Sequence, residues 1–286
     1  MISITRAIQH ATARINSRLE AEILMGDVLH RDRAWLYAHG NDHLTPDELS
    51  RFESLLARRE RGEPIAYLTG SREFYGRDFS VNPAVLIPRP ETELLIDLAL
   101  DRLPKKQCRV VDVGTGSGCI ALTLAAERPH WRVTAIDLSE SALAVCTTNA
   151  HHLGLDRVRL LQGDLLGPVH DETFEAIVSN PPYVAANDPH LEQGDLRFEP
   201  AAALSAGSQG LAVIDRLIDQ ASTRLSSGGW LILEHGHDQG PSVIDRMLRG
   251  GLHNVVTHTD LAGIDRVTLG QQPEAGPLSS CNRTAP

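Results

Sequence analysis

The chain has 286 residues, of which 42% are hydrophobic and only 4% aromatic, which is enough for two domains with mostly aliphatic cores. Its formal net charge is −10 and it has no long Lys/Arg run, which argues against a protein that binds nucleic acid mainly through phosphates. The four cysteines lack metal-ligand spacing, and no segment resembles a signal peptide or approaches the ~20 apolar residues of a membrane span. We therefore expect a soluble cytoplasmic protein without a metal site.

Residues 1–70 are predicted to be helical, because apolar residues recur there at helical spacing without strand-like alternation. The segment 45–48 (Thr-Pro-Asp-Glu) has the pattern of a capping box with proline at the first helical position, and Gly62 marks the end of that helix. The charged run 58–61 is then expected to be a solvated helix end, where cations suit the helix dipole.

Residues 71–91 are predicted to form a β-hairpin or an extended connector. Gly70, Gly76 and Asn82 separate short apolar or aromatic runs, a pattern that indicates strands joined by turns. Pro88 and Pro90 close the segment and disfavour helix for the residues before them.

From residue 92 to about 270, strands and helices are predicted to alternate, which is typical of an open α/β sheet with helices on both faces. The expected strands are 109–113, 131–137, 158–161, 174–179, 230–233, 253–257 and 266–269. Helices are expected after the first two strands and at about 209–226 and 240–249. The remaining tail, 271–286, is rich in Pro, Gly and Ser and is predicted to be disordered.

A glycine-rich loop follows the strand 109–113. Glycines allow positive φ and close approach of a ligand to the backbone, and helix amides there can receive a polar group. The spacing is G-x-G-x-G rather than the dinucleotide pattern G-x-G-x-x-G, so segment 112–118 resembles motif I of S-adenosylmethionine (SAM) methyltransferases. Asp137, at the end of the next strand, is placed to accept both ribose hydroxyls. An ordinary strand-to-helix turn with a solvated aspartate is the alternative.

The segment Asn180-Pro181-Pro182-Tyr183 follows the strand 174–179, at the edge where open α/β sheets bind ligands. The Asn180 side-chain oxygen and the Pro181 carbonyl can each accept one N–H of a conjugated amine, which directs the nitrogen lone pair at a methyl donor. Tyr183 supplies a face for a planar group. The pattern predicts methyl transfer to such a nitrogen by positioning and electrostatics, without metal or covalent nucleophile. A proline-rich turn without catalytic role is the alternative.

Several longer strings point to one family. They are GEPIAYL (62–68), LIPRPETE (86–93), the loop 112–118, NPPY (180–183), RFEP (197–200) and LEHG (233–236). Together they resemble the PrmC/HemK family of peptide chain release factor N5-glutamine methyltransferases, over nearly the whole chain. This joint pattern is more specific than NPPY alone, which DNA adenine-N6 and cytosine-N4 methyltransferases share.

The resemblance implies a Rossmann-like class I SAM-dependent methyltransferase domain at 92–270, with a seven-stranded, mostly parallel sheet. It implies a small helical N-terminal domain (1–70) that recognises the substrate, joined by a β-hairpin (71–91). SAM would be the methyl donor. The acceptor would be the glutamine of the Gly-Gly-Gln motif in class 1 release factors, so the modification would modulate translation termination.

Residue roles follow from the matched motifs. The cofactor contacts implied are Gly114, Thr115, Gly116, Ser117, Gly118, Asp137, Leu165 and Asn180. The substrate contacts implied are Asn180, Pro181, Pro182 and Tyr183, of which Asn180, Pro181 and Tyr183 are catalytic. Some family members place an aromatic residue after the aspartate at 164; here Leu165 can still cover the adenine ring.

Two other interpretations stay open at this stage. A nucleic-acid N6-adenine methyltransferase shares NPPY, but the acidic charge and the missing target-recognition segment disfavour it. A SAM-binding regulatory or adaptor module is disfavoured because a pure binder has no use for two acceptors aimed at an amine. A monomer without membrane or direct nucleic-acid contact is expected. Arg89, Glu91 and Glu199 either shape the glutamine pocket or lock the hairpin to the catalytic domain.

Overall fold

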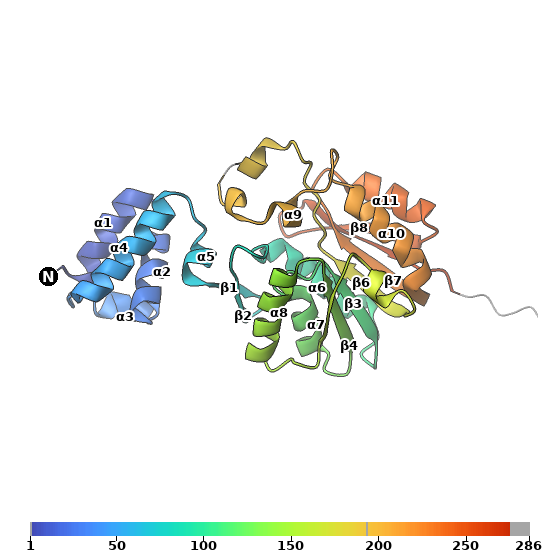
Figure 1. Cartoon of the computed structure of the whole chain (residues 1–286), viewed down its shortest axis with the longest axis horizontal. Coiled ribbons are helices and arrows are strands. Elements are labelled where there is room, and N and C mark those ends of the chain that lie inside the picture. Colours follow the sequence, from blue (N-terminus) through green and yellow to red (C-terminus); the bar gives the residue numbers. More distant parts are fainter. Residues whose placement is uncertain (1, 193, 275–286) are drawn as a thin grey trace, which may run out of the picture.

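The structure, a computed structural model, describes residues 2–192 and 194–274. A helical N-terminal domain and a larger α/β domain lie one after the other along the long axis of the molecule (Figure 1). The disorder expected for the tail falls on residues 275–286, outside the described residues, whereas Gln271 belongs to a strand. Within the described ranges, no helix combines the length and apolar character needed to cross a membrane.

The N-terminal domain is helical, as predicted. Its helices are α1 (Ile4–Ile15), α2 (Arg18–Leu29), α3 (Arg33–Ala38), α4 (Pro46–Glu60) and α5 (Ile65–Thr69). The capping box is confirmed, because Thr45 Oγ1 accepts from the Glu48 amide at 3.3 Å and the Glu48 carboxylate accepts from the Thr45 amide at 2.8 Å. Gly62 follows α4 with a φ of 90°, a left-handed conformation that glycine adopts without strain.

The predicted hairpin is also present. It consists of β1 (Ser71–Phe74) and β2 (Arg77–Ser80), which pair antiparallel. The turn residues Tyr75 and Gly76 have φ values of 52° and 71°, as a two-residue hairpin turn with two left-handed positions requires. Phe74 and Phe79 are buried in the core of the α/β domain, so the hairpin packs on the catalytic side of the junction.

The α/β domain is built on a seven-stranded sheet with the order β5-β4-β3-β6-β7-β9-β8. The strands are β3 (Arg109–Val113), β4 (Arg132–Asp137), β5 (Arg159–Gln162), β6 (Phe174–Ser179), β7 (Leu225–Glu234), β8 (His253–Thr259) and β9 (Asp265–Gln271). Strands β3 to β7 pair in parallel, and β9 runs antiparallel to β7 and β8. The predicted mostly parallel, Rossmann-like sheet is confirmed.

Helices cover both faces of this sheet. One face carries α6 (Glu93–Arg102), α7 (Cys119–Glu127) and α8 (Glu140–His152), and the other carries α10 (Ala212–Arg224) and α11 (Gly240–Arg249). Alternate residues of one strand enter different cores: Ala176 and Val178 of β6 face the first set, and Ile177 faces the second. A short helix α9 (Ala201–Leu204) and the 3₁₀ turns η1 (Pro90–Thr92), η2 (Gly167–Val169), η3 (Pro189–Glu192) and η4 (Leu196–Phe198) lie in the connections.

The strand order creates a switch point between β3 and β6. From β3 the chain proceeds outward through β4 and β5, whereas β6 and β7 extend the sheet in the opposite direction. Loops that leave the carboxyl ends of two such strands diverge and leave a crevice for ligands. The glycine loop follows β3 and the NPPY segment follows β6, so both lie at this switch point.

Candidate active site

The glycine loop uses left-handed backbone at three positions. Gly114, Gly116 and Gly118 have φ values of 74°, 56° and 84°. No described atom lies within 4 Å of a Cβ built on Gly114 or Gly116, so the space beside their backbone is open. At Gly118, in contrast, such a Cβ would lie 2.5 Å from Cys146 Sγ. The first two glycines therefore leave room for a ligand, and the third allows α7 and α8 to pack closely.

The amides of this loop are largely used within the protein. Gly114 and Thr115 donate to the Ile136 carbonyl at 2.8 and 3.0 Å, and Gly118 donates to the Thr115 carbonyl at 2.8 Å. Gly116 donates to Asp137 Oδ2 at 2.8 Å. These bonds hold the loop against β4. A ligand there would meet an ordered backbone surface, and most of the amide donors that the sequence suggested for it are already bonded.

Asp112 lies buried beneath the loop at the end of β3. Its Oδ2 accepts from Thr115 Oγ1 at 2.6 Å and from the Ala121 amide at 3.2 Å. Burial raises the pKa of this carboxyl to about 7, and those two hydrogen bonds oppose the increase. Its Oδ1 and the hydroxyl of Ser117 are buried without a hydrogen-bond partner among the described residues. Asp112 Oδ1, at the base of the loop, can therefore accept a further hydrogen bond.

Asp137 lies at the carboxyl end of β4, where the sequence placed a ribose-binding residue. One oxygen accepts from Gly116 and the other from the Ser139 amide at 2.9 Å. Each carboxylate oxygen has a further lone pair, so these bonds orient the group without exhausting it.

The two leucines of this edge have opposite environments. Leu165, the residue predicted to cover adenine, is 8% exposed and belongs to a hydrophobic cluster with Val113 and Ile136 at the ends of β3 and β4. Leu138, directly after Asp137, is 68% exposed. The sequence suggested no role for Leu138, although its position beside the acidic residue was visible. An exposed apolar side chain next to Asp137 is the better candidate for contact with a planar ring.

The NPPY segment is tied to the glycine loop and to the proline-rich connector. Ser179 Oγ donates to the Val113 carbonyl at 2.6 Å, which joins the ends of β6 and β3 directly before the two loops. Asn180 Nδ2 donates to Thr92 Oγ1 at 3.1 Å. Because the amide nitrogen is engaged, Asn180 Oδ1 is left as the acceptor. Thr92 ends η1 and is 2% exposed. The sequence suggested no role for it beyond its place in the string LIPRPETE.

Tyr183 is anchored at both its side chain and its backbone. Its hydroxyl donates to Glu234 Oε1 at 3.3 Å, and its carbonyl accepts from Gln239 Nε2 at 2.9 Å. Burial and the Glu234 carboxylate raise the pKa of the hydroxyl, so it remains protonated. A Cβ at Gly210 would lie 2.0 Å from the Tyr183 carbonyl oxygen, so glycine is required there. These contacts leave the ring partly exposed.

Glu234 ends β7 and is 1% exposed, but the sequence suggested no role for it. Burial raises the pKa of its carboxyl to about 7. The next residue, His235, is buried with Nδ1 at 2.8 Å from the Gly236 carbonyl and Nε2 at 2.8 Å from Thr268 Oγ1, which makes it a structural residue. In the part of the chain that the structure describes, no three His, Cys, Asp or Glu side chains gather into a possible metal site.

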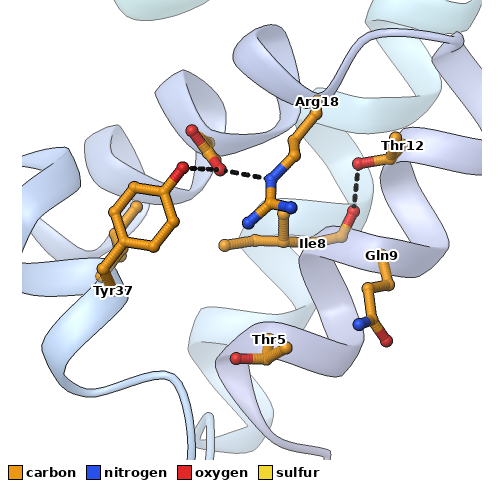
Figure 2. A pocket seen from close by; sticks show the side chains of 8 residues that line it. Thr5, Ile8, Gln9, Thr12, Arg18 and Tyr37 are labelled. Carbon is orange, nitrogen blue, oxygen red and sulfur yellow. Dashed lines mark hydrogen bonds and ion pairs between the residues drawn. The ribbon is translucent and has the colours of Figure 1, made fainter.

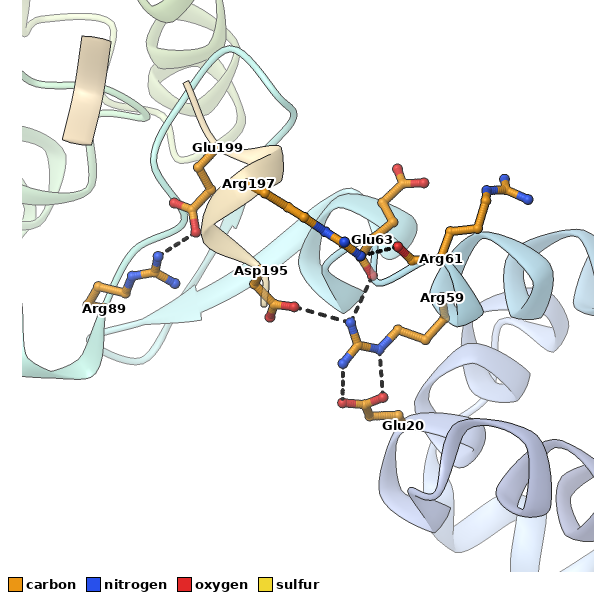
Figure 3. A network of polar contacts seen from close by, with 8 residues as sticks. All are labelled: Glu20, Arg59, Arg61, Glu63, Arg89, Asp195, Arg197 and Glu199. Atoms are coloured by element: carbon orange, nitrogen blue, oxygen red, sulfur yellow. Dashed lines mark hydrogen bonds and ion pairs between the residues drawn. The ribbon is translucent and has the colours of Figure 1, made fainter. Parts of the chain in front are cut away.

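Arg89 and Glu199 join the connector to the loop after NPPY. The Arg89 guanidinium pairs with Glu199 (Figure 3). The second Glu199 oxygen accepts from the Ile87 amide at 3.2 Å. Glu199 is 6% exposed, and burial raises its pKa although Arg89 opposes this. Of the two roles considered for this pair, the contacts support the lock between segments.

A second set of contacts reaches the helical domain. Arg59 binds Glu20 in bidentate fashion at 2.7 and 3.0 Å and Asp195 at 3.2 Å, and Arg197 donates to the Arg61 carbonyl (Figure 3). A Cβ on Gly62 would lie 2.1 Å from the Arg197 guanidinium. The expectation of a solvated helix end is therefore wrong for Arg59, which is 19% exposed and links the two domains.

This fold and site define a class I methyltransferase, and comparison with known proteins agrees. The family model described as the PrmC N-terminal domain matches residues 6–70, and the one described as the methyltransferase small domain matches residues 91–210. A methyltransferase structure from Pyrococcus furiosus, 18% identical, superposes with a TM-score of 0.54 over 77% of this chain and 99% of that one.

Sequence relatives identify the particular family. The release factor glutamine methyltransferase of Escherichia coli K12 is 45% identical over 94% of this chain and 97% of its own length. The protein of the same name from Salmonella typhimurium LT2 is 48% identical over 89% of this chain and 92% of its own. The chain belongs to the release factor glutamine methyltransferase family.

Proposed function

We propose that this protein transfers a methyl group from SAM to the side-chain amide nitrogen (N5) of the glutamine in the Gly-Gly-Gln motif of class 1 release factors. The observation that carries the proposal is the placement of Asn180. Its amide nitrogen is held by Thr92, which leaves its oxygen as an acceptor beside the switch point. Membership of the family supplies the identity of the acceptor protein.

The residues of the glycine loop fit SAM. The open space beside Gly114 and Gly116 admits a ligand close to the backbone, and the unpartnered Oδ1 of buried Asp112 suits a cationic group such as the ammonium of SAM. Asp137 can accept ribose hydroxyls, Leu138 can cover the adenine, and Thr115, Ser117 and the buried Leu165 complete the walls. SAM, when bound, supplies an electrophilic methyl carbon on a sulfonium.

The acceptor half of the site is made by this chain's own oxygens. A primary amide presents two N–H donors and a poorly nucleophilic nitrogen, because its lone pair is delocalised. Asn180 Oδ1 and the Pro181 carbonyl accept one N–H each and localise that lone pair towards the cofactor side. Pro182 stiffens the turn, and the Tyr183 ring lies along the amide plane. Preorganised acceptors of this kind lower the barrier without a covalent step.

The helical domain is the proposed recognition surface for the release factor. A pocket of about 200 Å³ opens on it, lined by Thr5, Ile8, Gln9, Thr12, Arg18, Glu22, Leu36 and Tyr37. Tyr37 and Arg18 converge on the buried Glu22 carboxylate at 3.0 and 2.7 Å (Figure 2). Tyr37 is 61% exposed, so its ring offers contact area at this pocket. Recognition there would orient the factor while its Gly-Gly-Gln loop reaches Asn180.

The domain division proposed is 1–70 for recognition, 71–91 for the connector and 92–270 for catalysis. The protein would act in the cytoplasm as a monomer, with a protein substrate and no direct contact to nucleic acid. The acidic net charge of −10 supports a protein rather than a nucleic-acid substrate.

The test incubates the purified protein with methyl-labelled SAM and three acceptors: a class 1 release factor, its Gln→Ala variant in the Gly-Gly-Gln motif, and duplex DNA. Label on the factor but not on its variant is the expected result. Label on DNA alone would overturn the choice of acceptor and favour an adenine methyltransferase. Binding of SAM without any label would favour an adaptor protein.

A further inference from the structure

Glu234 is a buried carboxylate beside the acceptor residues that is incompletely paired. Its Oε1 accepts from the Tyr183 hydroxyl at 3.3 Å, and the nearby Thr92 hydroxyl lowers the pKa of the carboxyl, which favours the ionised form. Its Oε2 has no partner within residues 2–192 and 194–274. A buried carboxylate that is not fully hydrogen-bonded lowers the stability of a protein, so its presence here points to a functional role.

Thr92 hydrogen-bonds to Asn180 and influences the ionisation of Glu234. A threonine hydroxyl has one proton and accepts through its lone pairs. When that proton is directed to Glu234, the Thr92 oxygen is left to accept, and it accepts from Asn180 Nδ2 at 3.1 Å. The Asn180 amide must then turn its nitrogen towards Thr92 and its oxygen away from it. Thr92, which lies 88 positions before Asn180 in the sequence, thus sets the orientation of the Asn180 amide.

We propose that Glu234 is a positioning residue: through Thr92 it holds the Asn180 oxygen towards the acceptor amide, and through the Tyr183 hydroxyl it holds the ring. The inference rests on the proposed function, because only an N–H acceptor role requires Asn180 to present oxygen rather than nitrogen. Glu234 touches neither cofactor nor glutamine in this scheme and acts through its two neighbours.

The ionised form of Glu234 is the one that orders both hydroxyls. Burial opposes ionisation and raises the pKa to about 7, Arg266 of the neighbouring strand β9 lowers it, and Glu91 raises it. Cys119 of α7 also lies within electrostatic range of this carboxylate. We therefore expect kcat of the wild-type enzyme to rise with pH through about 7, and this rise to be absent when residue 234 carries no titratable group.

Matched variants test the scheme. In Glu234→Gln the new amide can donate to Thr92, so the Thr92 proton is free to turn towards Asn180 and admit the flipped amide. Thr92→Val removes the hydroxyl, whereas Thr92→Ser keeps it. Glu175→Gln is the control, because Glu175 lies at the opposite end of β6 and accepts from the Arg109 amide at 2.6 Å.

We expect kcat to fall about 100-fold in Glu234→Gln and Thr92→Val, as for a misplaced reacting group, with SAM affinity within about twofold of wild type. Thr92→Ser should retain most of the activity, and Glu175→Gln should keep the wild-type pH profile. The scheme is overturned by a Glu234→Gln enzyme with wild-type kcat and pH profile, or by equal damage from Thr92→Ser and Thr92→Val. If Glu234→Gln does not fold, the comparison of Thr92→Ser with Thr92→Val tests the scheme.

An activity-free measurement separates this inference from the proposed function. The side-chain NH₂ resonances of Asn180, assigned by their loss in Asn180→Asp, should exchange slowly with solvent in wild type and rapidly in Glu234→Gln and Thr92→Val. A wild-type protein that shows this protection but labels no release factor would refute the proposed acceptor and keep the positioning network. Rapid exchange in wild type would refute the network even if the factor is methylated.

Discussion

The two halves of the active site are built in different ways. The glycine loop is made mostly of backbone: its left-handed glycines, its bonds to the Ile136 carbonyl and one bond to the Asp137 carboxylate form an ordered surface. The NPPY half depends on side chains from distant segments, since Asn180 reaches Thr92 and Tyr183 reaches Glu234, 88 and 51 residues away. The glycine half thus depends on few side chains, chiefly the Asp112 and Asp137 carboxylates that hold the loop, whereas the NPPY half is sensitive to single side-chain atoms.

The largest expected effect comes from the acceptor half. Asn180→Ala removes the side-chain oxygen proposed to accept the substrate N–H, so kcat should fall at least about 100- to 1000-fold, the usual cost of one preorganised polar group at a reacting centre. SAM affinity should change by less than about tenfold, because the glycine loop remains intact. Single-turnover methylation and calorimetric SAM titration measure the two effects. A comparable loss of kcat and of SAM affinity would contradict the separation of the site into an acceptor half and a cofactor half.

Alanine substitutions at Gly118 and at Gly116 should disturb the glycine loop for different reasons, the first through packing and the second through ligand binding. Gly118→Ala places a methyl 2.5 Å from Cys146 Sγ at a φ of 84°, so we expect a loss of about 2–4 kcal/mol in unfolding free energy. Gly116→Ala has a φ of 56° but open space, so the loss should be about 1 kcal/mol. The methyl of Gly116→Ala fills the ligand side, and SAM affinity should drop about tenfold or more. Urea unfolding and SAM titration distinguish the two; equal stabilities would contradict the packing argument.

The buried carboxylate makes stability depend on pH. The folded-state pKa of Glu234 is about 7 against an ordinary value of 4.5, so the folded protein holds this proton more tightly than the unfolded chain does. Its contribution is present below about pH 4.5 and is lost as pH rises through about 7. Relative to wild type, Glu234→Gln should therefore gain about 3 kcal/mol of unfolding free energy between pH 5 and pH 8. Urea unfolding at both pH values measures this, and a constant difference would show that Glu234 does not titrate there.

Within the glycine-loop half, Leu138 and Leu165 should respond differently to truncation. Leu138→Ala should weaken SAM binding by about 1–2 kcal/mol and leave stability nearly unchanged, because the side chain is 68% exposed. Leu165→Ala should cost about 2–3 kcal/mol of stability, because the side chain is 8% exposed and packs in the core. Thermal unfolding and SAM titration of both variants provide the test, and the reverse ranking would support Leu165 as the adenine contact.

The smallest effect is expected at the link between domains. Arg59→Ala breaks the pairs with Glu20 and Asp195, which should cost about 1 kcal/mol of stability. Methylation of the whole factor should suffer in KM more than in kcat, since the chemistry lies in the other domain. Arg72→Ala, on the exposed β1, is a matched control. A large fall in kcat with unchanged KM would mean that this link orders the NPPY loop.

Contiguous residues determined much of this protein. Helical spacing, the capping box at Thr45, the hairpin turn and the alternation after residue 92 predicted the architecture, because these signals arise from contacts within a few residues. Strand ends were less accurate: β7 begins at Leu225 rather than Trp230. Leu225 pairs with Phe174 of β6, but the register shifts before Trp230, and Gly228 and Gly229 weaken the strand pattern there. The motifs also led to the family.

Only the tertiary structure decided how the two halves of the site are supported. The strand order placed the loops after β3 and β6 at one switch point, and the packing buried Leu165 but left Leu138 exposed. It likewise paired Asn180 with Thr92, Tyr183 with Glu234, and Arg59 with Asp195. These contacts join residues 51 to 136 positions apart, and such pairing depends on the packing of whole elements, which no local pattern encodes.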